Sequence, residues 1–217
     1  MEEQPVTWTM DDSTRASSPG GIRVSRLLWL RHYPKWPFLW AASLIVMVVL
    51  AWMVHWVFWI PAGLLLGMNF LYWKRIQEHF LHGCVNASVV VSLDPMWIAV
   101  ATDLSKGIGD YPAIKIIHKE LSRIGGQQPQ VGSRLPTVAL YASDGKDETP
   151  HWVDFDPRPA QCATSDDREL QRLMDSIDSE DWDDLDARLG EIPRPYHVGL
   201  YRLWESSGDP ASGSSSR

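Results

Sequence analysis

The stretch HFLHGC brings three potential metal ligands, His79, His82 and Cys84, within six residues. Imidazole nitrogens and thiolate sulfurs are good ligands for zinc or copper. A closed structural zinc site needs four ligands, and neither a C-x-x-C nor an H-x-x-x-H motif accompanies these three. A membrane metal sensor is therefore one hypothesis. Its competitor is a pair of interfacial histidines beside a small buried cysteine.

A thiol nucleophile at Cys162 is a second chemical hypothesis. Cys162 precedes a predicted helix, and a helix N-terminus lowers the pKa of a thiol. His151 could act as its base, with Asp154 or Asp156 orienting the imidazole, if the fold brings these residues together. The competing interpretation is that Cys162 is a small apolar side chain in the core.

The stretch TDLSKGIGDYP resembles a phosphate-binding loop only in part. It contains Gly107 and Gly109 beside Lys106. A phosphate cradle also needs a longer glycine pattern and a helix that opens directly after it. Pro112 argues against such a helix, so a surface loop between strands is expected.

The stretch SEDWDDLDARLGE is rich in carboxylates at Asp181, Asp183, Asp184 and Asp186. It lacks the central glycine and the terminal glutamate of a calcium-binding loop. A solvated acidic face on a helix is therefore expected. Between Asp166 and Glu191 there are eleven acidic residues against three arginines, so this surface could meet a basic protein partner.

Composition limits the remaining classes of function. The formal net charge is −7, which argues against nucleic acid as a partner because a phosphate backbone needs a clustered basic surface. Two cysteines in 217 residues do not form a disulfide framework. No motif implies a cofactor. The absence of a strong catalytic motif favours a protein that is not an enzyme.

The run from Pro37 to Trp73 contains no charged residue and is too long for one membrane crossing. As a single helix it would reach roughly 55 Å, whereas the hydrocarbon core is about 30 Å thick. Trp and Tyr favour the membrane interface, and here they form three groups, the middle one at Trp52–Trp59. A single span would have two interfacial groups, whereas a hairpin has a third at its turn, so the pattern predicts a transmembrane helical hairpin. The alternative is a single span over about Phe38–Ile60 followed by an interfacial segment.

Basic residues flank this run on both sides. Arg23, Arg26, Arg31 and Lys35 precede it, and Lys74 follows it directly. Cytoplasmic flanks carry the Lys/Arg excess. Two crossings put both basic flanks on one side, so both termini are expected in the cytoplasm and the protein in the inner membrane. The segment 22–36 could lie on the membrane surface and contact anionic lipid headgroups of the bilayer, but the favoured interpretation is a topology signal for the first span.

The rest of the sequence predicts a single soluble α+β domain over residues 76–205. The two ends of the chain, residues 1–21 and 206–217, are expected to be disordered tails. Short β-branched runs separated by turn residues indicate a mostly antiparallel sheet or a small open barrel. Two amphipathic helices are expected in TSDDRELQRLMDSI, capped by Asp166, and SEDWDDLDARLGEI, capped by Ser179 and ended by Gly190. The predicted strands are Val85–Leu93, Met96–Thr102, Ala113–Leu121, Pro136–Ser143 and His197–Trp204.

Five stretches of this domain carry a family pattern: AVATDLSKGIGDYPAIKII, PTVALY, HWVDFDP, CATSD and GLYRL. Together they resemble DUF3239, an uncharacterised bacterial family of membrane-anchored proteins. The resemblance covers roughly residues 80–205. It implies a bacterial membrane protein and, because that family has no assigned activity, no particular chemistry.

The functional hypothesis with most support from the sequence is a membrane-anchored, cytoplasmic-facing domain with an interaction or accessory role. Its basis is the predicted anchor, the acidic helical face and the lack of a catalytic motif. The alternatives are the thiol-dependent enzyme at Cys162 and His151 and the metal sensor at His79, His82 and Cys84.

Overall fold

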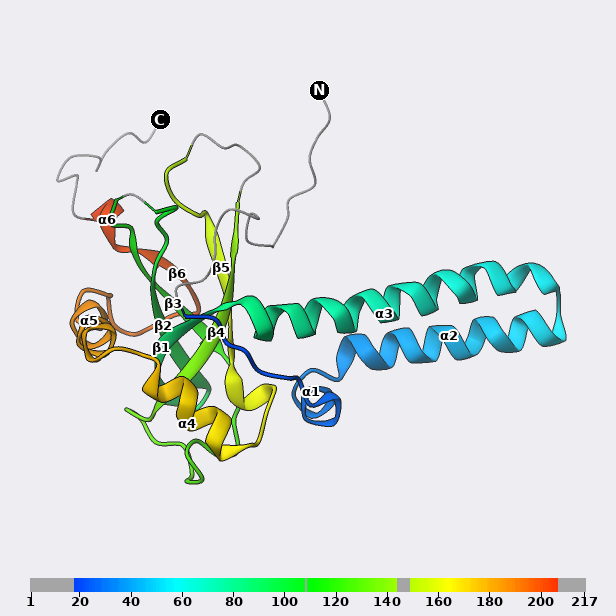
Figure 1. Cartoon of the computed structure of the whole chain (residues 1–217), viewed down its shortest axis with the longest axis horizontal. Coiled ribbons are helices and arrows are strands. Elements are labelled where there is room, and N and C mark those ends of the chain that lie inside the picture. Colours follow the sequence, from blue (N-terminus) through cyan, green and yellow to red (C-terminus); the bar gives the residue numbers. More distant parts are fainter. Residues whose placement is uncertain (1–17, 108, 144–148, 207–217) are drawn as a thin grey trace.

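The computed structural model describes residues 18–107, 109–143 and 149–206. Two long apolar helices project sideways from a curled antiparallel sheet, which shorter helices cover (Figure 1). This is the predicted α+β architecture. The outer parts of both predicted tails, residues 1–17 and 207–217, lie outside the described residues.

The predicted helical hairpin is confirmed. Helix α2 covers Lys35–Met53 and helix α3 covers Trp59–His82, and the two lie side by side (Figure 1). They are joined at the middle aromatic group by the short 3-10 helix η1, Trp56–Phe58, whose start is capped by the His55 ring accepting from the Val57 N–H at 3.2 Å. Proline is tolerated in the first turn of a helix, and Pro61 lies there in α3.

Both helices are long and apolar enough to cross a membrane. Only 11% of the most apolar stretch of α2, and 6% of that in Trp56–His82, is buried inside the protein. The core helix of a soluble protein would be mostly buried. Unsatisfied backbone groups are not tolerated in hydrocarbon, and a helix satisfies its own. The two helices therefore indicate membrane association.

A single six-stranded sheet forms the body of the domain. Its strand order is β5-β4-β1-β2-β3-β6, and every neighbouring pair is antiparallel. The β-branched runs form its central strands, and both faces of these strands are largely buried. The strands are β1 (Cys84–Leu93), β2 (Met96–Asp103), β3 (Pro112–His118), β4 (Arg134–Ala142), β5 (Asp154–Pro159) and β6 (Gly199–Arg202).

Strand β5 was not expected from the sequence. Its residues, DFDPRP, include two prolines, which remove backbone N–H donors and usually exclude a strand. The strand is tolerated because it lies at the edge of the sheet, where it pairs only with β4. Phe155 anchors it by full burial in the core.

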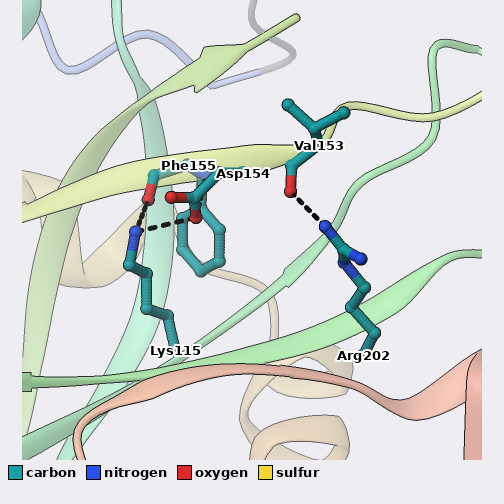
Figure 2. A network of polar contacts seen from close by, with 5 residues as sticks. All are labelled: Lys115, Val153, Asp154, Phe155 and Arg202. Atoms are coloured by element: carbon teal, nitrogen blue, oxygen red, sulfur yellow. Dashed lines mark hydrogen bonds and ion pairs between the residues drawn. The ribbon is translucent and has the colours of Figure 1, made fainter. Parts of the chain in front are cut away.

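The sheet curls until its two edges face each other. Lys115 on β3 donates to the Asp154 carboxylate at 2.7 Å and to the Phe155 carbonyl, both on β5 (Figure 2). Arg202 on β6 donates to the Val153 carbonyl at 2.9 Å (Figure 2). Strands β3 and β6 lie at one end of the sheet order and β5 at the other, so side chains of β3 and β6 hold the half-barrel together where backbone pairing stops.

Two helices pack on the sheet as expected. Helix α4 covers Asp167–Asp175 and lies against β4, and helix α5 covers Ser179–Leu189 and lies against β1, β2 and β3. The Asp166 carboxylate caps α4 by accepting from the Arg168 N–H at 2.9 Å, as predicted. The prediction that Ser179 caps α5 was wrong, since Asp178 is the N-cap residue and Ser179 is already helical. Gly190 ends α5 as predicted, and a short helix α6 (Leu203–Ser206) follows β6.

The N-terminal segment packs on the sheet domain. The Gly20 N–H donates to the Gly83 carbonyl at 2.9 Å, and the Ile22 N–H donates to the Phe80 carbonyl at 3.1 Å. A Cβ atom on Gly20 would lie 2.5 Å from the Phe80 oxygen, so only glycine allows this approach. Ile22 and Trp29 are fully buried in the core, the latter from helix α1, Arg26–His32. Gly20 and Gly21 thus pair with the end of α3, and Ile22 and Trp29 add to the core of the domain predicted at 76–205.

We expect Ile22→Ala to lower the free energy of unfolding of the full-length protein by about 2–5 kcal/mol, because it leaves a cavity in the core. Leu27→Ala is the matched control: Leu27 is 82% exposed, so its truncation should change stability by less than about 0.5 kcal/mol in detergent. Denaturant unfolding followed by a signal from the sheet domain measures both variants. Equal shifts would show that the N-terminal segment is not a core element.

Candidate functional site: an acidic cleft beside helix α5

A cleft of about 780 Å³ opens between one end of the sheet and helix α5. Residues of β1 and β2 form its floor, and the β2–β3 loop, the end of α4 and one side of α5 form its walls. Helix α5 lies there because Trp182 and Leu185 are buried against the sheet, which turns the remaining side of the helix toward the cleft and solvent.

The floor of the cleft holds a hydrogen-bonded polar cluster of Asn86, Thr102 and Tyr141. The Thr102 hydroxyl donates to the Asn86 amide oxygen at 2.9 Å, and the Tyr141 and Thr102 hydroxyls lie 2.6 Å apart. The Asn86 amide nitrogen donates to the Cys84 carbonyl at 3.0 Å. Burial raises the pKa of Tyr141 well above its ordinary value, so its phenol stays protonated.

The β2–β3 loop is organised by one carboxylate. Asp103 accepts from the backbone N–H groups of Ser105 and Tyr111, both at 2.9 Å, and from the Ser105 hydroxyl at 2.7 Å. Strand β3 begins at Pro112, so the predicted surface loop is confirmed. A loop built around a carboxylate and followed by a strand lacks the helix N-terminus that a phosphate cradle requires.

The cleft is strongly acidic. Its lining includes five carboxylates and one guanidinium: Asp103, Asp110, Asp178, Asp181, Asp184 and Arg188. The guanidinium forms an ion pair with Asp184 at 2.8 Å, one turn away on α5. Of the other acidic residues singled out in α5, Asp186 pairs with Arg134 at 2.7 Å, and Asp183 does not line the cleft. Carboxylates gathered in a concave surface give it a negative potential that attracts cations.

Cys162 lies in the core and not in the cleft. Its side chain is fully buried at the end of the 3-10 helix η2, Ala160–Cys162. Burial raises the pKa of the thiol to about 12, although Lys119 and Tyr33 oppose the shift. The expectation of a thiol pKa lowered by a helix N-terminus was therefore wrong. Desolvation dominates, and α4 begins only at Asp167.

The structure does not bring Cys162 and His151 together. His151 precedes β5 and Cys162 follows it, and a six-residue strand spans about 20 Å. The His151 ring packs against Tyr111 and Trp204. The two candidate orienting carboxylates are engaged elsewhere, Asp154 with Lys115 at 2.7 Å and Asp156 with Arg158 at 2.8 Å.

The three candidate metal ligands lie in three different environments. The His79 ring is buried and lies 2.8 Å from the Val138 carbonyl of β4. His82 is exposed at the end of α3, and Cys84 begins β1 beside the polar cluster of the cleft. Within the described parts of the chain, no group of three or more His, Cys, Asp or Glu residues is arranged to hold a metal ion.

Sequence reasoning missed the polar cluster on the floor. Asn86 and Thr102 are polar residues inside apolar strand runs, and both are buried. A buried polar side chain in a strand needs a partner, which was the available signal. The partner, Tyr141, comes from β4, and only the sheet pairing shows that it lies beside them.

A family model whose description is "Protein of unknown function (DUF3239)" matches residues 73–192, from the end of the apolar run to just beyond α5. The match covers more than half of the chain. The chain belongs to the DUF3239 family. The DUF3239 match includes most of the cleft, so the cleft is built largely within the family domain.

One solved structure similar to this DUF3239 chain is described as "Crystal structure of a putative membrane protein from Corynebacterium diphtheriae". The two share 21% sequence identity, and the alignment covers 55% of this chain and 99% of that one with a TM-score of 0.47. No curated protein matches the chain.

The buried thiol makes a prediction about reactivity. In a Cys84→Ser background, we expect Cys162 to stay unmodified by an aromatic disulfide reagent at about pH 8, because only a minute fraction of a thiol with so high a pKa is ionised. Unfolding in denaturant should expose it to rapid and complete modification. Fast modification of the folded protein would contradict the assigned burial and restore Cys162 as a candidate nucleophile.

Proposed function

We propose that this DUF3239 protein is a membrane-anchored domain that faces the cytoplasm and binds a basic segment of a partner protein in its acidic cleft. The observation that carries the proposal is the presence of five carboxylates and only one guanidinium in the lining of this concave surface. Lysine and arginine side chains offer hydrogen-bond donors and no acceptors, so such a surface is complementary to them.

The floor of the cleft supports this choice of ligand. The Asn86 amide oxygen already accepts from the Thr102 hydroxyl at 2.9 Å and the Tyr141 hydroxyl at 3.3 Å, which leaves the Tyr141 hydroxyl oxygen as the floor atom that can accept a hydrogen bond from an incoming ammonium or guanidinium group. The volume of about 780 Å³ has room for side chains of this length. The acidic wall on α5 would attract the basic segment, and the polar floor would bind the ends of its side chains.

The cytoplasmic orientation rests on charge. Basic side chains flank the hairpin on both sides, with Arg31 before α2, Lys35 as the first residue of α2, and Lys74 and Arg75 within α3, whereas the turn at Val54–Phe58 has no Lys or Arg. Positively charged flanks favour the cytoplasmic side. Helix α3 leads directly into β1, so the sheet domain is expected on the same side as these flanks, at the inner membrane.

Charge reversal in α5 tests the proposed ligand. Asp181→Lys should weaken binding of a fluorescent arginine-rich peptide roughly five- to ten-fold, because it replaces one attraction in the cleft by a repulsion. Asp183→Lys is the matched control, since Asp183 is exposed on the same helix but does not line the cleft. Fluorescence anisotropy with the full-length protein measures both. Equal weakening, or no binding by the unmodified protein, would contradict the proposal.

Topology reporters test the orientation. A reporter active only in the cytoplasm should be active at the C-terminus, and one active only outside should be active when fused after Trp56. Ala187→Cys gives an independent probe, because Ala187 is exposed on α5 whereas the native Cys162 is buried. An impermeant thiol reagent should leave Ala187→Cys unlabelled in intact cells and label it after permeabilisation. Labelling in intact cells would place the domain outside.

A further inference from the structure

Helix α1 lies where the hairpin joins the sheet domain. Only Tyr33 and Pro34 separate its last residue from α2. The Trp29 indole N–H donates to the Tyr72 hydroxyl of α3 at 2.8 Å, and the Arg26 guanidinium lies over the Trp73 ring at 5.5 Å. Tyr and Trp are the residues that favour the membrane interface, so α1 is fixed at the interfacial level of the hairpin.

The direction of α1 differs from that of the hairpin. In Figure 1 α1 is seen end-on, whereas α2 and α3 extend across the picture. A helix that runs crosswise to a membrane-spanning hairpin lies along the membrane surface. A hairpin that spans the membrane would therefore place α1 roughly parallel to the membrane plane.

The two sides of α1 have opposite surroundings. Trp29 is 1% exposed and stacks on Tyr33, with ring centroids 4.2 Å apart, so this side faces the core. Leu27 is 82% exposed, and Arg26 and Arg31 beside it are exposed as well. A large apolar side chain flanked by cations is the composition of a helix that lies in the interface.

We propose that α1 is an interfacial helix that inserts Leu27 into the boundary between headgroups and acyl chains and binds anionic phospholipid headgroups through Arg26 and Arg31. Charge complementarity supports anionic lipid as the occupant. Exposed basic residues at the same level extend the surface from α1 to both helices of the hairpin: Arg23, Arg26, Arg31, Lys35, Lys74 and Arg75. Glu78, the acidic residue one turn further along α3, pairs with Lys74 at 3.5 Å.

Insertion of α1 into the membrane surface would also fix the orientation of the sheet domain. Trp29 connects the interfacial helix to the sheet, since it belongs to the core cluster that the sheet forms and the Arg158 guanidinium of β5 lies over its ring at 5.2 Å. The membrane would then hold the sheet domain at three places, the two helices of the hairpin and α1. The acidic cleft would be presented at a fixed orientation to the membrane surface.

Spin labels in vesicles of phosphatidylcholine mixed with phosphatidylglycerol test the insertion of Leu27. The labels are attached to the full-length protein in a Cys84→Ser background, at Leu27→Cys, at Ile45→Cys in the middle of α2, and at Ala187→Cys on α5. Labels at 27 and 45 should collide more with oxygen than with a water-soluble nickel complex, and the label at 187 should show the reverse preference. A label at 27 that behaves as the one at 187 overturns the proposal. A water-exposed label at 45 also overturns it, because no membrane surface would then lie at α1.

Charge reversal tests the preference for anionic lipid. The measurement is the ratio of phosphatidylglycerol to phosphatidylcholine that remains bound after extraction, determined by native mass spectrometry. A basic residue at an anionic surface contributes about five-fold in affinity, so Arg31→Glu should lower this ratio by about five-fold. Arg194→Glu, an exposed arginine in the loop after α5, should leave it unchanged. Equal ratios for the two variants would overturn the headgroup assignment.

Discussion

The continuity of helix α3 with strand β1 is the constraint on which the rest of the structure depends. Gly83 alone separates the last helical residue from the first strand residue. A Cβ atom there would contact the His79 and Ala139 carbonyl oxygens, so the junction has no space for a side chain. The apolar hairpin and the sheet are therefore joined without a flexible linker, and motion of one must move the other.

The N-terminal segment, which precedes the hairpin in the sequence, also packs against this junction. It runs beside the end of α3 and the start of β1, with hydrogen bonds to the carbonyls of Phe80, Leu81 and Gly83. Ile22 and Trp29 then fill the core between the sheet and the hairpin. Residues on both sides of the apolar run thus belong to one folding unit, although the run separates them in sequence.

The curl of the sheet creates the concave surface. Lys115 on β3 and Arg202 on β6, at one end of the sheet order, reach across to Asp154 on β5 and to Val153 just before it, at the other end, which closes one side of the half-barrel. At the same end of the molecule, the Trp152 N–H donates to the Leu104 carbonyl at 2.7 Å and fixes the loop after β2. The acidic cleft lies against this loop because α5 packs across β1 and β2.

The sequence by itself determined the elements whose signals are local. Hydrophobic length and three aromatic groups predicted the two apolar helices, β-branched runs predicted β1 and β2, and apolar spacing predicted α4 and α5. Only the tertiary structure decided which distant residues meet. It placed Asn86, Thr102 and Tyr141 in one cluster, buried Cys162 away from His151, and added the proline-containing β5. Local patterns depend on a residue's own neighbours in the chain, whereas desolvation, sheet register and edge position depend on segments that are far apart in it.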